Sequence, residues 1–181
     1  DSVLDGIAKE FGAISILVNN AGITRDNLLM RMKEDDWVSI IDTNLTSVCR
    51  TSKAVMRGMM KARKGRIINI ASVIGVTGNA GQANYAAAKA GLAHLAEGIR
   101  ADMIAEKRPV TVTTIYPGYI RTELNIGAKY LPFESEEAEG VEAIVQAIEA
   151  KVDEAFVPAW PWLPIGIGMK VLPLRLMTQF L

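Results

Sequence analysis

The sequence predicts an α/β fold in which a parallel sheet carries helices on both faces. Three features support this prediction: short apolar runs typical of strands buried on both faces, long segments with apolar residues at helical spacing, and the alternation of the two along the chain. Polar and glycine-containing motifs follow the apolar runs directly. Such motifs fall at the carboxyl ends of parallel strands, where open α/β sheets bind their ligands. Right-handed crossover connections are then expected to place helices on both faces.

Helices and strands alternate from the first residues onward. Residues 2–11 are predicted to form a helix, because their apolar side chains recur at helical spacing until Gly12. The apolar run at 14–18 is predicted to be a buried strand. Residues 34–64 have the pattern of one long helix, and residues 66–71 have that of the second strand.

The second half of the chain continues the alternation. A loop containing three glycines separates the second strand from a helix predicted over 84–106. Residues 110–116 are rich in β-branched side chains and should form a strand, followed by a helix over 135–151 and a short strand over 154–158. The fifteen uncharged residues 155–169 are too few, and too rich in proline and glycine, for a transmembrane helix.

The composition argues against several classes of function. Twenty basic and twenty acidic residues among 181 give no net charge, so nothing favours binding to nucleic acid. Cys49 is the only cysteine, which rules out an internal disulfide and fits a cytoplasmic location; we expect its thiol to be buried. His94 is the only histidine, and no metal site or serine–histidine triad is expected around it.

Tyr85 and Lys89 are the pair that points most directly to chemistry. They stand four residues apart in a predicted helix and therefore share one face. A nearby ammonium lowers the pKa of a phenol, and a tyrosine tuned in this way exchanges a proton near neutral pH. That is the acid needed when hydride reduces a carbonyl. Taken alone, the pair has a simpler explanation as part of an amphipathic helix surface.

In the order and spacing of its motifs, the chain resembles the classical short-chain dehydrogenases/reductases. The resemblance covers nearly the whole chain. Residues 16–92 are similar to bacterial 3-oxoacyl-(acyl carrier protein) reductases, whereas the remainder is similar to other oxidoreductases of the superfamily. The matching motifs are Asn19-Asn20-Ala21-Gly22, Asn44, Ser72, Tyr85 with Lys89, Pro117-Gly118, Ile120 and Thr122.

The resemblance implies a catalytic set of four residues. Tyr85 gives the substrate oxygen its proton or takes it away, and Ser72 holds that oxygen. Lys89 lowers the pKa of Tyr85 and binds the nicotinamide ribose. Asn44 kinks its helix and holds a water that links Lys89 to solvent.

The resemblance also implies a binding site for NADP or NAD, without deciding between them. Asn19, Ala21 and Gly22 are expected to line the adenosine-ribose side, where glycine permits close approach of the backbone. Tyr85 and Lys89 are expected at the nicotinamide ribose. The residues expected at the carboxamide end are Pro117, Gly118, Ile120 and Thr122.

One motif of the family does not occur in this sequence. The family holds the cofactor pyrophosphate in a Gly-x-x-x-Gly-x-Gly turn after its first strand, and Gly75, Gly78 and Gly81 do not follow that pattern. The resemblance therefore implies a Rossmann-like parallel sheet lacking its first three strands. Residues 1–158 are expected to form this truncated catalytic domain, and residues 159–181 an apolar tail.

An NAD(P)-dependent oxidoreductase that interconverts a carbonyl and a secondary alcohol is the function that the resemblance implies. The nearest substrate analogy is a 3-oxoacyl thioester. Two alternatives stay open: a truncated or chimeric relative that keeps the fold and oligomer surface without catalysis, and a module that binds apolar ligands or a membrane surface through its tail. Packing of the tail on the chain's own core or on a neighbouring subunit is the simpler explanation.

The two long helices predicted over 34–64 and 84–106 have more apolar surface than one sheet face can cover. In the family that the chain resembles, such helices pair across a two-fold axis. A homodimer or homotetramer is therefore expected, with an isologous contact between the helices.

Overall fold

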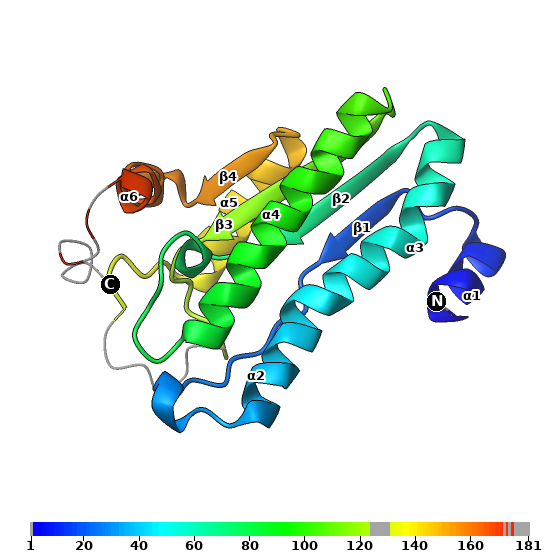
Figure 1. Ribbon diagram of the computed structural model, residues 1–181. Helices are drawn as coiled ribbons and strands as arrows, with labels where there is room; N and C mark the ends of the chain where they lie inside the picture. Colours follow the sequence, from blue (N-terminus) through cyan, green and yellow to red (C-terminus); the bar gives the residue numbers. More distant parts are fainter. Residues whose placement is uncertain (1, 124–130, 172, 174, 176–181) are drawn as a thin grey trace.

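Four parallel strands form the centre of the computed structural model, which describes residues 2–123, 131–171, 173 and 175. The predicted α/β architecture is confirmed, and each strand begins and ends within two residues of its predicted position. The strands lie side by side in chain order (Figure 1). They are β1 (Ile16–Asn19), β2 (Gly65–Ile70), β3 (Val110–Pro117) and β4 (Glu154–Val157).

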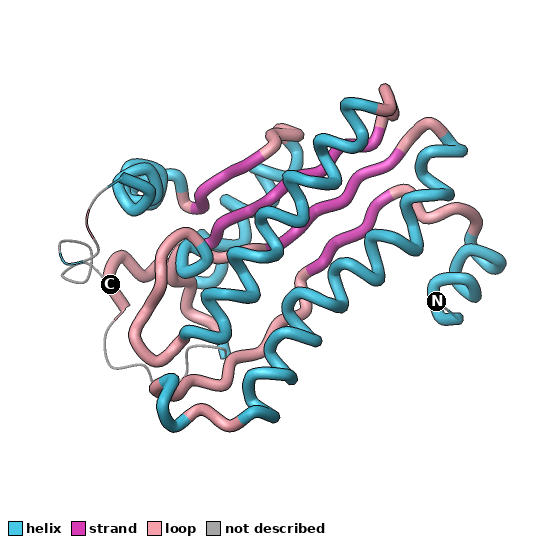
Figure 2. Tube along the Cα trace, viewed as in Figure 1, coloured by secondary structure: helices cyan, strands magenta, loops and turns pink. Residues whose placement is uncertain are grey.

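Helices cover both faces of the sheet, as predicted (Figures 1 and 2). α3 (Ser47–Ala62) and α4 (Ala83–Ala105) pack on one face, against a core that includes Ile67. α5 (Glu137–Glu149) packs on the other face, against a core that includes Ile68. Consecutive residues of a strand point to opposite faces, so β2 supplies both cores.

The connection through α5 has the opposite hand to the two connections before it. The strands are added in one direction across the sheet, yet α5 lies on the other face from α3 and α4. Right-handed crossovers throughout would have placed all three helices on one face. The helices therefore cover both faces because the connection through α5 has the opposite hand, which the sequence did not predict.

The predicted helix over 34–64 changes its geometry in the middle. α2 (Glu34–Ile41) leads into a π-helical turn, Asp42–Thr46, and α3 follows directly. A π turn inserts an additional residue into a helix and is frequent at functional sites. Here the turn contains Asn44, the residue that was expected to kink its helix.

β1 lies at one edge of the sheet, and within the described part of the chain its only strand partner is β2. α1 (Ser2–Phe11) precedes it and gives way at Gly12, whose φ of 88° favours glycine. Leu17 packs into the core beneath α3. Ile16 and Val18, on the other face, are 56% and 52% exposed. One face of this edge strand is therefore uncovered apolar surface.

The start of the tail forms a helix that the sequence analysis did not predict. α6 (Ala159–Val171) buries Trp162 and Met169 in the same core as Tyr116. The simpler explanation of the tail, packing on the chain's own core, is confirmed for this face of α6. Within the described residues, no helix is both long and apolar enough to cross a membrane.

Candidate active site

Three strand ends bring the predicted site residues to one edge of the sheet. β1 ends at Asn19 and leads into Gly22, β2 ends shortly before Ser72, and β3 ends at Pro117. Because the strands are parallel and paired in register, their carboxyl ends lie side by side. The strand-end motifs therefore lie close together at one edge of the sheet, as predicted.

Ser72 introduces a short 3₁₀ helix, η3 (Val73–Gly75), at this edge. Its hydroxyl oxygen accepts a hydrogen bond from the amide of Ile74 at 3.2 Å. Gly75 then packs on the backbone of α4, where a Cβ would lie 2.8 Å from the carbonyl carbon of Lys89. The absence of a side chain at Gly75 lets the loop approach α4 closely and hold Ser72 there.

Tyr85 lies in the first turn of α4 with 7% of its surface exposed. Burial raises the pKa of the phenol; a hydrogen bond with the Ser72 hydroxyl lowers it, and the charge of Asp26 raises it. The net shift of the pKa is upward. Ser72 and Tyr85 are thus brought into hydrogen-bonding contact, although they come from different elements.

Lys89 is buried one helical turn after Tyr85, but it acts on the phenol less directly than expected. Its ammonium donates a hydrogen bond to the carbonyl of Ile70 at 2.7 Å and lies 5.7 Å from the centroid of the Tyr85 ring. Burial lowers the pKa of Lys89 itself to about 8. In this structure burial dominates the pKa of Tyr85 and raises it. That Lys89 lowers the pKa of the phenol stays a prediction.

Asn44 is fully buried in the π turn and holds the segment that follows β1. Its amide oxygen accepts from the Ile23 amide at 2.9 Å, and its amide nitrogen donates to the Ile23 carbonyl at 2.9 Å. Gly22 adjoins this pair, where a Cβ would be 3.6 Å from both the Asn44 oxygen and the Lys89 nitrogen. Together with the contacts described above for the other three residues, these contacts define a set that we call the four-residue cluster: Asn44, Ser72, Tyr85 and Lys89.

The residues expected on the adenosine-ribose side lie in different environments. Asn19 is buried, with its side chain bonded to Asn69 on β2 and Thr51 on α3. Its side chain therefore ties β1 to the next strand and to α3 instead of lining the edge. Ala21 is exposed and Gly22 half-buried at the edge itself.

The residues expected at the carboxamide end are similarly divided. Pro117 and Gly118 are half-buried, and Thr122 is exposed. Ile120 is 8% exposed and lies against Gly140 of α5, where a Cβ would be 2.7 Å from its side chain. The side chain of Ile120 is thus part of the packing with α5, and its backbone forms a parallel bridge with Ser135.

Trp162 covers Gly118, and the sequence analysis did not identify it as part of the site. A Cβ on Gly118 would overlap the indole of Trp162. The indole makes edge contacts with Tyr119 and Phe133, at 5.5 Å and 6.1 Å between ring centroids. Neither a Pro-Gly turn nor an apolar tail indicates by itself that the two meet.

The segment after Gly22 is tied to the start of α4 by contacts that the sequence analysis also missed. The Asn84 side chain donates to the Arg25 carbonyl at 3.0 Å, and the Asn27 amide donates to the Gly81 carbonyl at 2.8 Å. These bonds connect the end of β1 with the helical turn that contains the phenol. No periodic pattern links positions so far apart in the chain.

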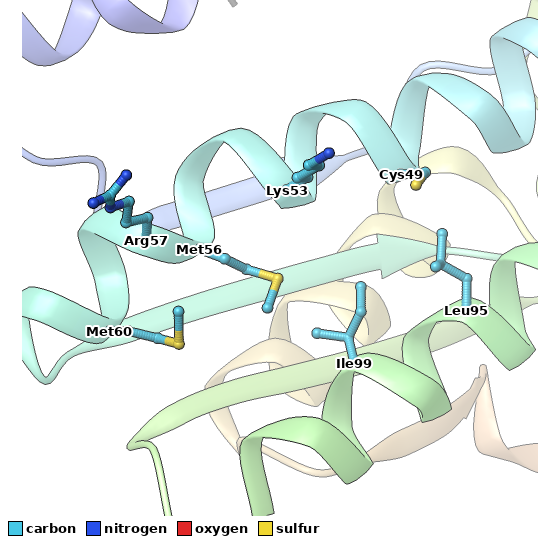
Figure 3. Close-up of a pocket in the computed structure, with 7 residues that line it drawn as sticks. All are labelled: Cys49, Lys53, Met56, Arg57, Met60, Leu95 and Ile99. Carbon is cyan, nitrogen blue, oxygen red and sulfur yellow. The ribbon is translucent and has the colours of Figure 1, made fainter. Parts of the chain in front are cut away.

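A groove runs between α3 and α4, away from the four-residue cluster (Figure 3). It has a volume of about 480 Å³, with thioether and branched side chains between two cationic ones. Cys49 is exposed here, so the expectation of a buried thiol is wrong. The lining residues are Cys49, Lys53, Met56, Arg57, Met60, Leu95 and Ile99.

Comparisons with known proteins agree with the resemblance found in the motifs. The family model described as short chain dehydrogenase matches residues 1–130, which include the four-residue cluster. The 3-oxoacyl-(acyl-carrier-protein) reductases of Vibrio cholerae and Salmonella typhimurium are each 60% identical over 124 residues, and that of Escherichia coli is 59% identical over the same length. These matches cover 68% of the chain and 50% of each relative, so the chain spans about half the length of the curated relatives it matches.

Proposed function

Because the chain belongs to the short-chain dehydrogenase family, we propose that it is an NAD(P)-dependent oxidoreductase interconverting a carbonyl and a secondary alcohol. The placement of Ser72 beside the buried phenol of Tyr85 at the carboxyl edge of the sheet is the observation that supports this most strongly. A hydroxyl beside a buried phenol can bind a carbonyl oxygen and deliver a proton to it.

Tyr85 acts as the acid of the reduction. Its raised pKa keeps the phenol protonated at neutral pH, ready to transfer the proton to the substrate oxygen. Ser72 donates a hydrogen bond to the same oxygen and stabilises the negative charge that develops there. A nicotinamide supplies the hydride to the carbonyl carbon when it is bound. The reverse reaction needs a phenolate, which burial disfavours in this structure.

Gly22, Lys89 and Asn44 fit the ribose of a nicotinamide nucleotide. The missing side chain of Gly22 leaves space beside the Lys89 ammonium and the Asn44 amide oxygen. Lys89 uses one of its three donors on Ile70, and the other two suit the hydroxyls of a ribose. A water near Asn44 that returns a proton to the phenol by way of Lys89 is part of the proposal. Further proposed cofactor contacts are Ala21, Pro117, Gly118, Ile120 and Thr122.

A 3-oxoacyl thioester is the substrate that we propose. The support is the similarity to 3-oxoacyl-(acyl-carrier-protein) reductases, which reach 60% identity over 124 residues. The competing possibility is a non-catalytic relative that keeps the fold and the oligomer surface. A cytoplasmic location belongs to the same proposal.

Titration of the chain with NADPH and NADH tests the proposal. We expect micromolar binding of one nucleotide and reduction of a 3-oxoacyl thioester. Tyr85→Phe should lower turnover by roughly 10²–10⁴-fold while leaving nucleotide affinity nearly unchanged. Tyr116→Phe is the matched control, because Tyr116 is also buried, at 4% exposed, but stacks on Phe156 outside the cluster. Absence of binding at millimolar nucleotide would favour the non-catalytic relative.

We also propose that a second copy of the chain covers the groove between α3 and α4. Met56, Met60, Leu95 and Ile99 present apolar surface along two long helices, and a two-fold axis would bury this surface against itself. An isologous dimer of this kind agrees with the oligomer expected from the two helices.

A further inference from the structure

A row of polar residues crosses the sheet beneath the strand ends that form the candidate site. Asn19, Asn69 and Thr114 are paired in register on β1, β2 and β3. Register partners on parallel strands point to the same face, which here is the face under α3 and α4 (Figure 1). The three residues are 9%, 1% and 0% exposed. Polar groups buried to this degree are expected to be hydrogen-bonded.

The half of this row that crosses from β1 to β2 is fully paired. The Asn19 amide nitrogen donates to the Asn69 amide oxygen at 2.8 Å and to the Ser52 hydroxyl at 3.3 Å. The Asn19 amide oxygen accepts from the Thr51 hydroxyl at 2.8 Å. These bonds also fix which end of the Asn69 amide faces β3, since its oxygen is directed at Asn19.

The half that crosses from β2 to β3 is not paired. The Asn69 amide nitrogen and the Thr114 hydroxyl are both buried, and neither has a hydrogen-bond partner among the residues that the structure describes. Adjacent strands lie about 4.8 Å apart. A single water with hydrogen bonds of about 2.8 Å to each side spans that separation.

The buried polar side chains of the covering helices already have other partners. The buried polar residues of α4 are engaged elsewhere, Asn84 with the Arg25 carbonyl and Lys89 with the Ile70 carbonyl. Ser52 of α3 already accepts from Asn19. The other buried positions of α4 nearest the sheet include three alanines, which offer neither donors nor bulk: Ala88, Ala93 and Ala96.

We propose that one buried water binds between Asn69 and Thr114. It accepts a hydrogen bond from the Asn69 amide and exchanges one with the Thr114 hydroxyl, which completes a polar row from Thr51 on α3 to β3. Loss of this water would loosen β3 from β2 just before the strand ends at Ser72 and Gly118. The inference is independent of the proposed enzymatic activity.

Two measurements on the full chain test this water. A high-resolution crystal structure should contain an ordered water within hydrogen-bonding distance of both atoms. Thr114→Val, which keeps the shape and removes the hydroxyl, should lower the melting temperature by about 2–4 °C, because the water loses one of its few partners. Asn69 is left unchanged so that its bond to Asn19 is kept.

An empty space between the two side chains predicts the opposite sign. If the space is empty, Thr114→Val removes a buried hydroxyl that has no partner, and the melting temperature rises. A raised melting temperature, a crystal structure without density at this point, or a direct hydrogen bond between Asn69 and Thr114 would each overturn the proposal. The crystal structure of the unsubstituted chain decides the matter even if the variant does not fold.

Discussion

The ammonium of Lys89 donates a hydrogen bond to the carbonyl oxygen of Ile70 at 2.7 Å, with the side chain 3% exposed. This bond connects the second turn of α4 to the last residue of β2, directly before the strand end that leads to Ser72. A buried ammonium with one neutral partner loses much of its hydration, which is why the pKa of Lys89 falls from 10.5 to about 8.

The lowered pKa of Lys89 predicts a specific pH dependence of stability. Between pH values of about 8 and about 10, an unfolded lysine still binds its proton while the folded one has released it, so rising pH favours the folded chain. The unsubstituted chain should gain about 2 kcal/mol of unfolding free energy over this window relative to Lys89→Met. Urea unfolding of both proteins across the window measures the difference. Parallel pH profiles would contradict the lowered pKa.

Gly75→Ala should separate the η3 loop from α4. A Cβ at this position would lie 2.8 Å from backbone at Lys89, which cannot move like the end of a flexible side chain, so we expect a loss of about 1–3 kcal/mol in stability. Gly78→Ala is the control within the same loop, because nothing lies within 4 Å of its Cβ position. Thermal unfolding compares the two variants. Equal melting temperatures would show that the loop is not held by this close approach.

Gly118 and Trp162 should be strongly coupled. Gly118→Ala places a methyl group where the indole lies, and Trp162→Leu removes the indole at a cost of about 3 kcal/mol for the lost packing. In the double variant the leucine leaves room for the methyl group. The loss of unfolding free energy should therefore be clearly smaller than the sum of the losses in the two single variants. A double-mutant cycle of unfolding free energies measures the coupling. Trp160→Leu, at a position that is 79% exposed, should change little.

Met60→Glu should weaken self-association if a second copy covers the groove. The substitution places a carboxylate in the apolar surface between α3 and α4, where a dimer would bury it. Sedimentation velocity should then show a shift toward monomer. Val141→Glu on α5 is the control, since Val141 is 49% exposed and lies outside the groove. Equal association of both variants would remove the groove as the contact surface.

The strands and the convergence of their ends were predictable because they depend on local sequence. Each apolar run is bounded by polar or glycine residues that end it, and the parallel arrangement then places Asn19, Ser72 and Pro117 at one edge. The position of Tyr85 and Lys89 on one face of α4 followed from their spacing alone. The contact between Ser72 and Tyr85 followed from the motif set, not from periodicity.

The features that the sequence did not predict depend on contacts between distant segments. The pKa of Tyr85 is set by how deeply α4 is covered, which spacing does not encode. Trp162 reaches Gly118 because α6 packs against β4, beside the residue that follows β3. The hand of the connection through α5 depends on which sheet face the helix covers, and no pattern within α5 indicates that face.

The uncovered side of β1 has a practical consequence for work with this chain. Among the described residues β1 pairs with one strand, so its other side offers peptide donors and acceptors to a further strand. Beside them lie Ile16 and Val18, at 56% and 52% exposed. Refolding from urea at high protein concentration should therefore give turbid samples, because the strand edges of separate molecules pair before folding is complete. Refolding at low protein concentration should leave the samples clear.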